Sequence, residues 1–278
     1  KNKGDFALWK FSKPDEPTWK TVLGSGRPGW HIEDTAITEH FFGPQYDLHG
    51  GGLDLKFPHH EAEIAQAEAA SGKKPFVRIW LHTGPLTIGK TKMSKSLGNF
   101  LTIGDFLRKY PAVVLRLLVL SHHYRTPLDY TGELVLENCK KWESVLEFMA
   151  RLRLVIRLSR SGRKVKMKDL TREFVTPLLD DFNTPLALAR LFEFMSEIQP
   201  KIWSLASGEA RVIEKLVAAN LNILGLTPKL PKIPAQITKL ALTREIFRRS
   251  KQFTQADLLR KKINGLGYGL DDTPLGPF

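Results

Sequence analysis

The spacing of apolar residues alternates between strand-like and helix-like over the first hundred residues. Residues 46–49 and 76–82 are apolar and β-prone, whereas residues 35–42 and 61–70 have the spacing of short helices. Strands that alternate with helices predict a parallel sheet, whose ligands bind beyond the carboxyl ends of the strands. Residues 1–30 are instead rich in proline and glycine, which predicts extended segments and loops.

Helical spacing dominates the rest of the chain. A long amphipathic helix is predicted over residues 133–158, and two or three helices over 171–226, where Asn183 or Thr184 can cap a helix that has Pro185 in its first turn. Residues 240–266 form a strongly basic pair of predicted helices. The polar, basic segment 159–168 and the proline-rich segment 227–237 are expected to be a linker and a stiff spacer. We therefore expect an α/β region followed by an all-α region.

The chain is strongly basic. It carries 42 Lys and Arg against 29 Asp and Glu, a net charge of +13, which favours a polyanionic partner such as nucleic acid; solvated surface lysines are the alternative. The single cysteine, Cys139, excludes an internal disulfide and fits a reducing compartment. No apolar run approaches the ~20 residues of a membrane span and no signal peptide is visible, so we expect a cytoplasmic protein without a membrane partner.

Candidate chemistry concentrates in residues 47–63, Asp-Leu-His-Gly-Gly-Gly-Leu-Asp-Leu-Lys-Phe-Pro-His-His-Glu-Ala-Glu. The adjacent glycines 50–52 let the backbone approach a ligand closely or adopt positive φ. His59 and Glu63 stand four residues apart, on one face if a helix begins after Pro58, and imidazole with carboxylate at this spacing suits zinc. The stretch is typical of a nucleotide loop beside a metal site.

Two other features extend this site along the chain. The segment 92–99, Lys-Met-Ser-Lys-Ser-Leu-Gly-Asn, has two lysines flanking two serines between Gly89 and Gly98, an arrangement suited to developing phosphate charge. Trp30 follows the turn sequence Gly-Arg-Pro-Gly. It either covers a core edge or forms the wall of a pocket.

These motifs together resemble a known family. Gly-Trp-His-Ile-Glu at 29–33, Asp-Leu-His-Gly-Gly-Gly at 47–52, Pro-His-His-Glu at 58–61 and the lysine-serine signature at 92–99 occur in the order seen in cysteinyl-tRNA synthetases of class I, and residues 32–36 resemble an archaeal variant. The resemblance extends over essentially the whole chain. It implies the distal half of a Rossmann-like catalytic domain, followed by a helical-bundle anticodon-binding region.

The resemblance also implies a division into domains. Residues 1–102 would hold the catalytic portion with the zinc site and lysine-serine loop, 103–168 a helical stem-contact region and linker, 169–232 the helical-bundle anticodon-binding domain, and 233–278 a basic helical hairpin. Such enzymes use ATP with Mg²⁺ to form cysteinyl-adenylate and transfer the cysteinyl group to the 3′ end of tRNA-Cys. The implied catalytic residues are Lys92 and Lys95. The implied ATP-binding residues are His49, Gly50, Gly52, Asp54, Met93, Ser94, Lys95 and Ser96.

The family binds the substrate thiolate on zinc, which selects cysteine over serine without editing. By resemblance His59 and Glu63 match two zinc ligands and Trp30 matches the aromatic wall of the cysteine pocket. Asp34 stands where most members have a zinc-binding cysteine, and we predict zinc held by Asp34, His59 and Glu63. His60 and His82 are treated as outer-shell or structural residues.

A second departure concerns the first half of the family's catalytic domain. That half carries a His-x-Gly-His signature and a further zinc-binding cysteine, and neither occurs in this sequence. The chain therefore resembles the distal half of the catalytic domain and all that follows it. It should supply half of an ATP site and three of four zinc ligands, so activity would need the first half as a separate or removed segment.

The basic hairpin resembles the part of these enzymes that reads the anticodon. Arg248, Asp257 and Asp272 match base-reading positions; ordinary helix-surface charges with a capping aspartate are the alternative. The lysines and arginines in 244–262 would add phosphate affinity that falls with salt. Two other functions stay open: a related ligase that joins cysteine to an amino-sugar, which does not need the basic hairpin, and a non-catalytic tRNA-binding paralogue, which does not need the lysine-serine loop.

Overall fold

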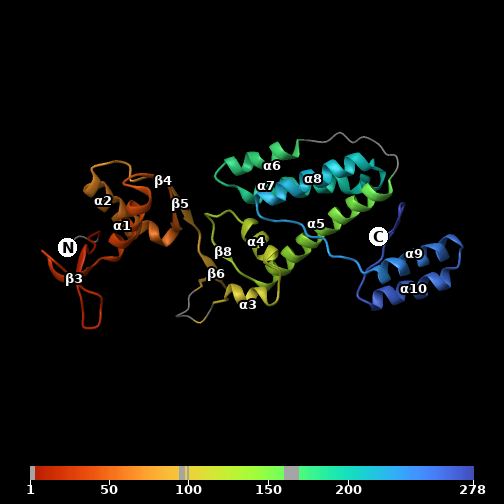
Figure 1. The fold of residues 1–278 in the computed structure, drawn as a ribbon, viewed down its shortest axis with the longest axis horizontal. Coiled ribbons are helices and arrows are strands. Elements are labelled where there is room, and N and C mark those ends of the chain that lie inside the picture. Colours follow the sequence, from red (N-terminus) through yellow and green to blue (C-terminus); the bar gives the residue numbers. More distant parts are fainter. Residues whose placement is uncertain (1–3, 94–97, 99, 160–168) are drawn as a thin grey trace. The chain divides into compact units, whose positions relative to one another are not determined.

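A computed structural model describes residues 4–93, 98, 100–159 and 169–278 of the chain (Figure 1). The chain divides into two compact units. Unit 1 comprises residues 1–100 with 124–130, and unit 2 comprises residues 101–123 with 131–278. Within the described ranges, no helix is both long enough and apolar enough to cross a bilayer.

Unit 1 begins with extended segments, as predicted. Strands β1 (Trp9–Phe11), β2 (Trp19–Thr21) and β3 (Gly24–Pro28) form an antiparallel sheet with β3 in the middle. Helix α1 (Trp30–Phe42) follows directly. The sequence pattern predicted this helix from residue 35, and that start is wrong by five residues. Extended Gly29 caps the helix, so the turn residues before Trp30 end a strand rather than form a loop.

The predicted parallel pair is confirmed. Strand β4 (Tyr46–Gly52) pairs in parallel with β5 (Val77–Thr83), and α2 (Glu61–Ser71) lies between them in sequence. A 3-10 turn (Leu53–Leu55) and a second helical turn (Lys56–His60) connect β4 to α2. Helix α2 packs against α1. This βαβ connection brings the carboxyl end of β4 next to the start of α2.

One of the two roles predicted for the glycines of β4, a positive φ, is not observed. Residues 50–52 continue the strand opposite Leu81, His82 and Thr83, and none of them has positive φ. Their other predicted role, close approach, is met at Gly51: a Cβ there would lie 2.7 Å from Cε1 of His60. The glycine therefore makes room for a neighbouring ring rather than for a turn.

A small sheet follows in unit 1. Strand β6 (Leu86–Ile88) pairs antiparallel with β7 (Thr91–Lys92) and parallel with β8 (Leu128–Asp129). The lysine-serine signature begins in β7. Lys92 and Met93 are described, and the backbone N–H of Met93 donates to the carbonyl of Leu86 at 3.0 Å. Ser94, Lys95 and Ser96 lie outside the described residues.

Unit 2 is helical (Figure 1). Its elements are α3 (Ile103–Leu107), α4 (Ala112–Leu120), α5 (Gly132–Leu158), α6 (Leu170–Leu179), α7 (Thr184–Ile198), a 3-10 turn (Gln199–Ser204) and α8 (Ser207–Ile223). The long helix predicted over 133–158 is confirmed as α5, and one hydrophobic core joins α4 to α8. Asn183 caps α7 by accepting from the backbone N–H of Leu186.

The C-terminal part of unit 2 has its own core. Helices α9 (Ala235–Arg249) and α10 (Phe253–Gly265) pack around Ile237, Ala241, Ile263 and Leu270. This confirms the predicted basic pair of helices, although α9 begins at Ala235, directly after Pro234 and inside the predicted spacer 227–237. The chain then forms a hairpin of β9 (Asp272–Thr273) and β10 (Gly276–Pro277), which the sequence pattern did not predict. In the predicted linker 159–168 only Ser159 is described, and the four-domain division stays a prediction.

Candidate active site

Helix α1 presents the first two residues of the site. Trp30 and Asp34 lie one helical turn apart, so they share a face of α1. The Trp30 indole stacks on the His59 ring with centroids 4.6 Å apart. Oδ2 of Asp34 lies 2.7 Å from Nε2 of His59. The early start of α1 therefore brings an aromatic wall and a carboxylate to the same imidazole.

His59 is the centre of the predicted metal set. Its Nε2 lies 2.7 Å from Oδ2 of Asp34 and also 2.7 Å from Oε1 of Glu63. A single imidazole nitrogen carries at most one proton and cannot donate to both oxygens. The ligand atoms of these three residues all lie within 4.8 Å of one another. The fold thus brings together three donors from α1, the turn before α2, and α2 itself.

Glu63 is the most enclosed of these groups. Its side chain is 0% exposed, and neither carboxylate oxygen has a hydrogen-bond partner among the described residues. Burial, and then the nearby charge of Asp34, raise the pKa of Glu63 to about 7. A buried carboxylate without donors is costly, and a bound cation relieves that cost. The oxygen and nitrogen donors present here fit zinc.

Further histidines surround this set. Nδ1 of His60 lies 2.8 Å from Nε2 of His82, and His49 contacts the hydroxyl of Tyr46 through Nδ1 at 2.5 Å. Burial, followed by the neighbouring His49 and His82, lowers the pKa of His60 to about 4. Burial also lowers the pKa of His49. These rings are therefore neutral near pH 7 and keep a nitrogen lone pair.

The residues expected to bind ATP fall into two environments. His49 is part of the buried histidine cluster, and its Nδ1 lies 3.9 Å from Oε2 of Glu63. Asp54 is exposed and forms an ion pair with Lys92, with Oδ2 and Nζ 2.6 Å apart. This hydrogen bond is the main cause of the lowered pKa of Asp54. Gly50 and Gly52 lie in β4 between the two environments in sequence.

The three residues expected to read the anticodon also lie in different environments. Arg248 and Asp272 form an ion pair at 2.7 Å, whereas Asp257 is exposed on α10. Asp272 is also bound by Arg244, whose Nη2 donates to Oδ2 at 3.0 Å. That hydrogen bond is the main cause of the lowered pKa of Asp272.

Sequence reasoning missed two residues. His31 lies with its Nδ1 2.6 Å from Nδ1 of His59, and Arg244 is 3% exposed at the centre of the ion-pair cluster in the C-terminal hairpin. His31 stands three residues before Asp34. In a helix that begins at Trp30, this spacing places the two side chains on the same face. Arg244 had no such signal, because its partner follows 28 residues later.

Comparisons with known proteins identify the family. Residues 1–140 match the model for the catalytic domain of class I (C) tRNA synthetases, and residues 173–227 match the DALR domain. The chain is 40% identical over 287 residues to a cysteine–tRNA ligase of Carboxydothermus hydrogenoformans, with 99% of this chain covered. The chain belongs to the cysteinyl-tRNA synthetase family. Another family member, from Aquifex aeolicus, is 40% identical over 309 residues and matches 98% of the chain.

Family membership confirms the resemblance and the fold class. A cysteine–tRNA ligase of Thermococcus onnurineus is 37% identical over 294 residues and matches 99% of the chain. The chain spans 62% of the length of each of these three relatives. Archaeal origin stays a prediction.

A solved structure shares the fold. The ternary complex of Agrobacterium radiobacter K84 agnB2 LeuRS with tRNA and LeuAMS aligns with a TM-score of 0.51 and 14% identity. The alignment covers 79% of this chain and 36% of the LeuRS chain. At this identity the match shows only that the class I synthetase architecture is common to both.

Proposed function

We propose that the chain is the cysteine-selecting and tRNA-binding portion of a cysteine–tRNA ligase. The reaction is ATP-dependent activation of cysteine to cysteinyl-adenylate, followed by transfer to the 3′ end of tRNA-Cys. The convergence of Asp34, His59 and Glu63 beneath Trp30 is the observation that carries this proposal. As tRNA charging supplies translation, we also propose that the protein acts in the cytoplasm.

Cysteine selection would rest on zinc held by Asp34, His59 and Glu63. Zinc bound there supplies a soft acceptor for the substrate thiolate, which a serine hydroxyl cannot match. The contact between His31 and His59 would fix the ring plane of His59, because an outer hydrogen-bond partner orients a ligating imidazole. Trp30, 56% exposed and stacked on His59, would cover the side chain of the bound cysteine.

ATP would bind at the carboxyl end of β4. Gly50 and Gly52 keep the strand backbone free of side chains there, as a nucleotide would need. Lys92 and Lys95, assigned by family resemblance, would neutralise the triphosphate, with Mg²⁺ bound by the nucleotide. The ion pair between Lys92 and Asp54 would then exchange for contacts to ATP.

The exposed sheet face supports a further polypeptide partner. Leu48 and Ile79 pair across β4 and β5, and they are 50% and 54% exposed. Parallel sheets are normally covered on both faces. We infer that this face receives the part of the synthetase that this chain does not span, which by resemblance carries the first half of the ATP site.

The basic hairpin supports tRNA as the nucleic-acid partner. Arg249, Lys261 and Lys262 are exposed on α9 and α10, where they can approach phosphates. Arg248, Asp257 and Asp272 stay our proposed anticodon contacts. Of these, Asp257 has the most accessible side chain position, on the outer surface of α10.

The decisive experiment is cysteine-dependent ATP–pyrophosphate exchange. The chain is combined with the first half of a cysteinyl-tRNA synthetase, added in trans or fused before Lys1. We expect exchange with cysteine and none with serine, and we expect Lys95→Ala to abolish it. A folded complex that binds tRNA without exchange would overturn the proposal and favour the tRNA-binding paralogue.

Aminoacylation separates the remaining alternative. A complemented enzyme that exchanges pyrophosphate with cysteine but does not charge tRNA-Cys would favour the amino-sugar ligase. We expect charging, because that ligase gives no role to the basic hairpin. Transfer of labelled cysteine to tRNA, with a non-cognate tRNA as the control, measures this directly.

A further inference from the structure

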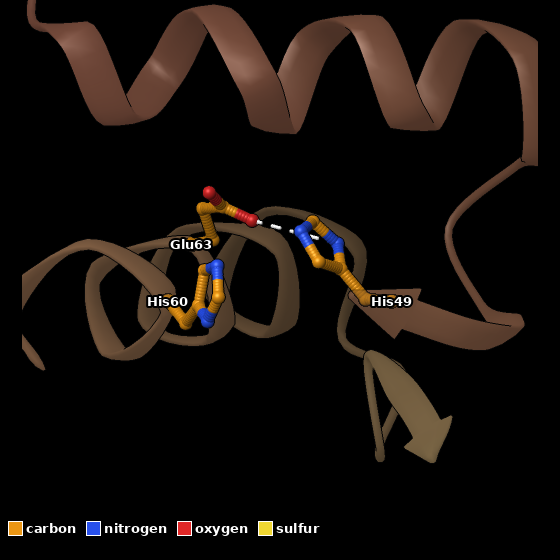
Figure 2. Close-up of side chains that lie close together, drawn as sticks. All are labelled: His49, His60 and Glu63. Atoms are coloured by element: carbon orange, nitrogen blue, oxygen red, sulfur yellow. Dashed lines mark ion pairs between the residues drawn. The ribbon is translucent and has the colours of Figure 1, made fainter. Parts of the chain in front are cut away.

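Glu63 has a second carboxylate oxygen that the proposed zinc site does not use. Oε1 lies 2.7 Å from Nε2 of His59, whereas Oε2 lies 3.9 Å from Nδ1 of His49. That separation is too long for a hydrogen bond. Figure 2 shows one carboxylate oxygen of Glu63 directed at the ring of His49, with the ring of His60 below the carboxylate. One buried oxygen therefore lies beside two imidazoles and has no hydrogen-bond donor within the described part of the chain.

His49, His60 and Glu63 form a second set of possible metal ligands. Their ligand atoms all lie within 4.8 Å of one another, as do those of Asp34, His59 and Glu63. His60 is 3% exposed and the side chain of His49 is 16% exposed. Two imidazoles and one carboxylate are a ligand combination that zinc accepts in proteins. The two sets share only Glu63.

Neighbouring side chains hold both rings of the second set. Nδ1 of His60 is hydrogen-bonded to His82, so Nε2 is the nitrogen of His60 that can bind a metal ion. His49 stacks on Trp80 with ring centroids 4.8 Å apart, and its Nδ1, the nitrogen that lies 3.9 Å from Oε2 of Glu63, contacts the hydroxyl of Tyr46. Outer contacts of this kind fix the orientation of metal-binding imidazoles. An ion bound by Nδ1 of His49 would displace the contact to the Tyr46 hydroxyl, while Trp80 and His82 would still hold the two rings.

We propose that His49, His60 and Glu63 form a second position for a zinc ion, overlapping the first through Glu63. The proposal does not require ligase activity, because it follows from the buried donors alone. It predicts that the site binds zinc even when the donors of the first set are removed. Zinc at the second position would have two imidazole ligands, whereas zinc at the first would have one from this chain.

The test removes the first set and measures what remains. The Asp34→Ala, His59→Ala double variant of the chain is loaded with Zn²⁺, dialysed and analysed for bound metal. We expect it to retain about one zinc, and adding His49→Ala or His60→Ala to lower its affinity at least ~10-fold, since even outer-shell changes cost 10–100-fold. X-ray absorption of the double variant should show two imidazoles per zinc.

His40→Ala is the matched control, because His40 is exposed on α1 and belongs to neither set. This change should leave zinc binding by the double variant unaltered. A double variant with native circular dichroism that binds no zinc would overturn the proposal, as would zinc binding that is insensitive to both His49→Ala and His60→Ala. If the alanine variant does not fold, Asp34→Asn with His59→Gln replaces it and is judged by the same criteria.

The outcome is independent of the proposed function. Failure of pyrophosphate exchange in the complemented protein would leave the metal count of the double variant unchanged. Conversely, loss of all zinc from the double variant would be consistent with zinc binding by Asp34, His59 and Glu63 in the wild-type chain. Retention of wild-type affinity in the double variant would assign zinc to the second position and refute the first.

Discussion

Nε2 of His59 and Oε1 of Glu63 lie 2.7 Å apart, although neither carboxylate oxygen of Glu63 has a hydrogen-bond partner among the described residues. Nε2 of His59 also lies 2.7 Å from Oδ2 of Asp34, and one imidazole proton cannot satisfy both carboxylates. The two groups are therefore in close contact, although the buried carboxylate of Glu63 is not balanced by a positive charge from the described part of the chain. This is the arrangement expected of residues that bind a metal ion.

Replacement of Asp34 tests the ligand that departs most from the family. We expect Asp34→Ala to lower zinc affinity more than ~10-fold, since outer-shell changes alone already reach that size. Glu39→Ala is the control, because Glu39 is exposed on the same helix and belongs to neither ligand set. Competition with a chromophoric chelator measures the affinities. Equal zinc affinity in the two variants would remove Asp34 from the site.

The pKa of Glu63 predicts how the metal-free protein responds to pH. Its folded value of about 7 exceeds the ordinary 4.5, so folding takes up a proton between these values. The stabilising contribution is therefore present below pH 4.5 and is lost as the pH rises through about 7. The full shift corresponds to about 3 kcal/mol in the free energy of unfolding.

Glu63→Gln isolates this effect. Urea unfolding of the wild-type and variant chains in chelator, from about pH 5 to about pH 8, gives the difference in unfolding free energy. We expect wild-type stability to fall relative to the variant as the pH rises. The lowered pKa of His60 acts in the opposite sense, but it is present in both proteins and largely cancels. A difference that does not change with pH would contradict the prediction.

Adjacent glycines in β4 provide a steric test of the site. A Cβ at residue 51 would lie 2.7 Å from the buried ring of His60, which is held by His82, whereas one at residue 50 would lie 3.9 Å from its nearest neighbour. Gly51→Ala should therefore destabilise the protein by about 1–3 kcal/mol, the usual cost of overpacking. Gly50→Ala should change stability by less than about 1 kcal/mol. Thermal unfolding compares the two, and similar losses would refute the close-approach explanation.

Asp272 forms ion pairs with Arg244 and Arg248 of α9, which predicts a structural role for Asp272. Asp272→Ala would leave the buried guanidinium of Arg244 without its carboxylate. Because the Asp272 side chain is 29% exposed, we expect a loss of about 2 kcal/mol rather than the 3–5 kcal/mol of fully buried pairs. Amide hydrogen exchange in α9 and α10 should accelerate. Asp271→Ala, at the exposed neighbouring residue, should leave exchange unchanged, and equal exchange in both variants would count against the prediction.

The basic hairpin predicts salt-dependent tRNA binding. Lys261 and Lys262 are exposed on α10, and removing a lysine that binds a phosphate should reduce the slope of log affinity against log salt by about 1. Filter binding of tRNA to Lys261→Ala and Lys262→Ala across salt concentrations measures this slope. Lys201→Ala, at an exposed position outside α9 and α10, is the control. A flat salt response of the wild-type chain would refute phosphate binding altogether.

Local sequence determined much of the fold. The four-residue spacing of His59 and Glu63 predicted their contact, because neighbouring turns of a helix hold such residues together. Apolar spacing predicted α5 and the parallel β4–β5 pair, and turn chemistry predicted the cap at Asn183. These features depend on residues close in sequence, or on a period repeated along one element.

Only the tertiary structure decided which donors share Glu63. His49 precedes it by fourteen residues on another element, and the sequence assigned that histidine to adenosine. The approach of His60 to Gly51 and the pairing of Arg244 with Asp272 likewise join distant segments. The sequence by itself determined the chemistry of the donors and the elements that carry them. Packing decided their partners, because no local period specifies how strands and helices meet.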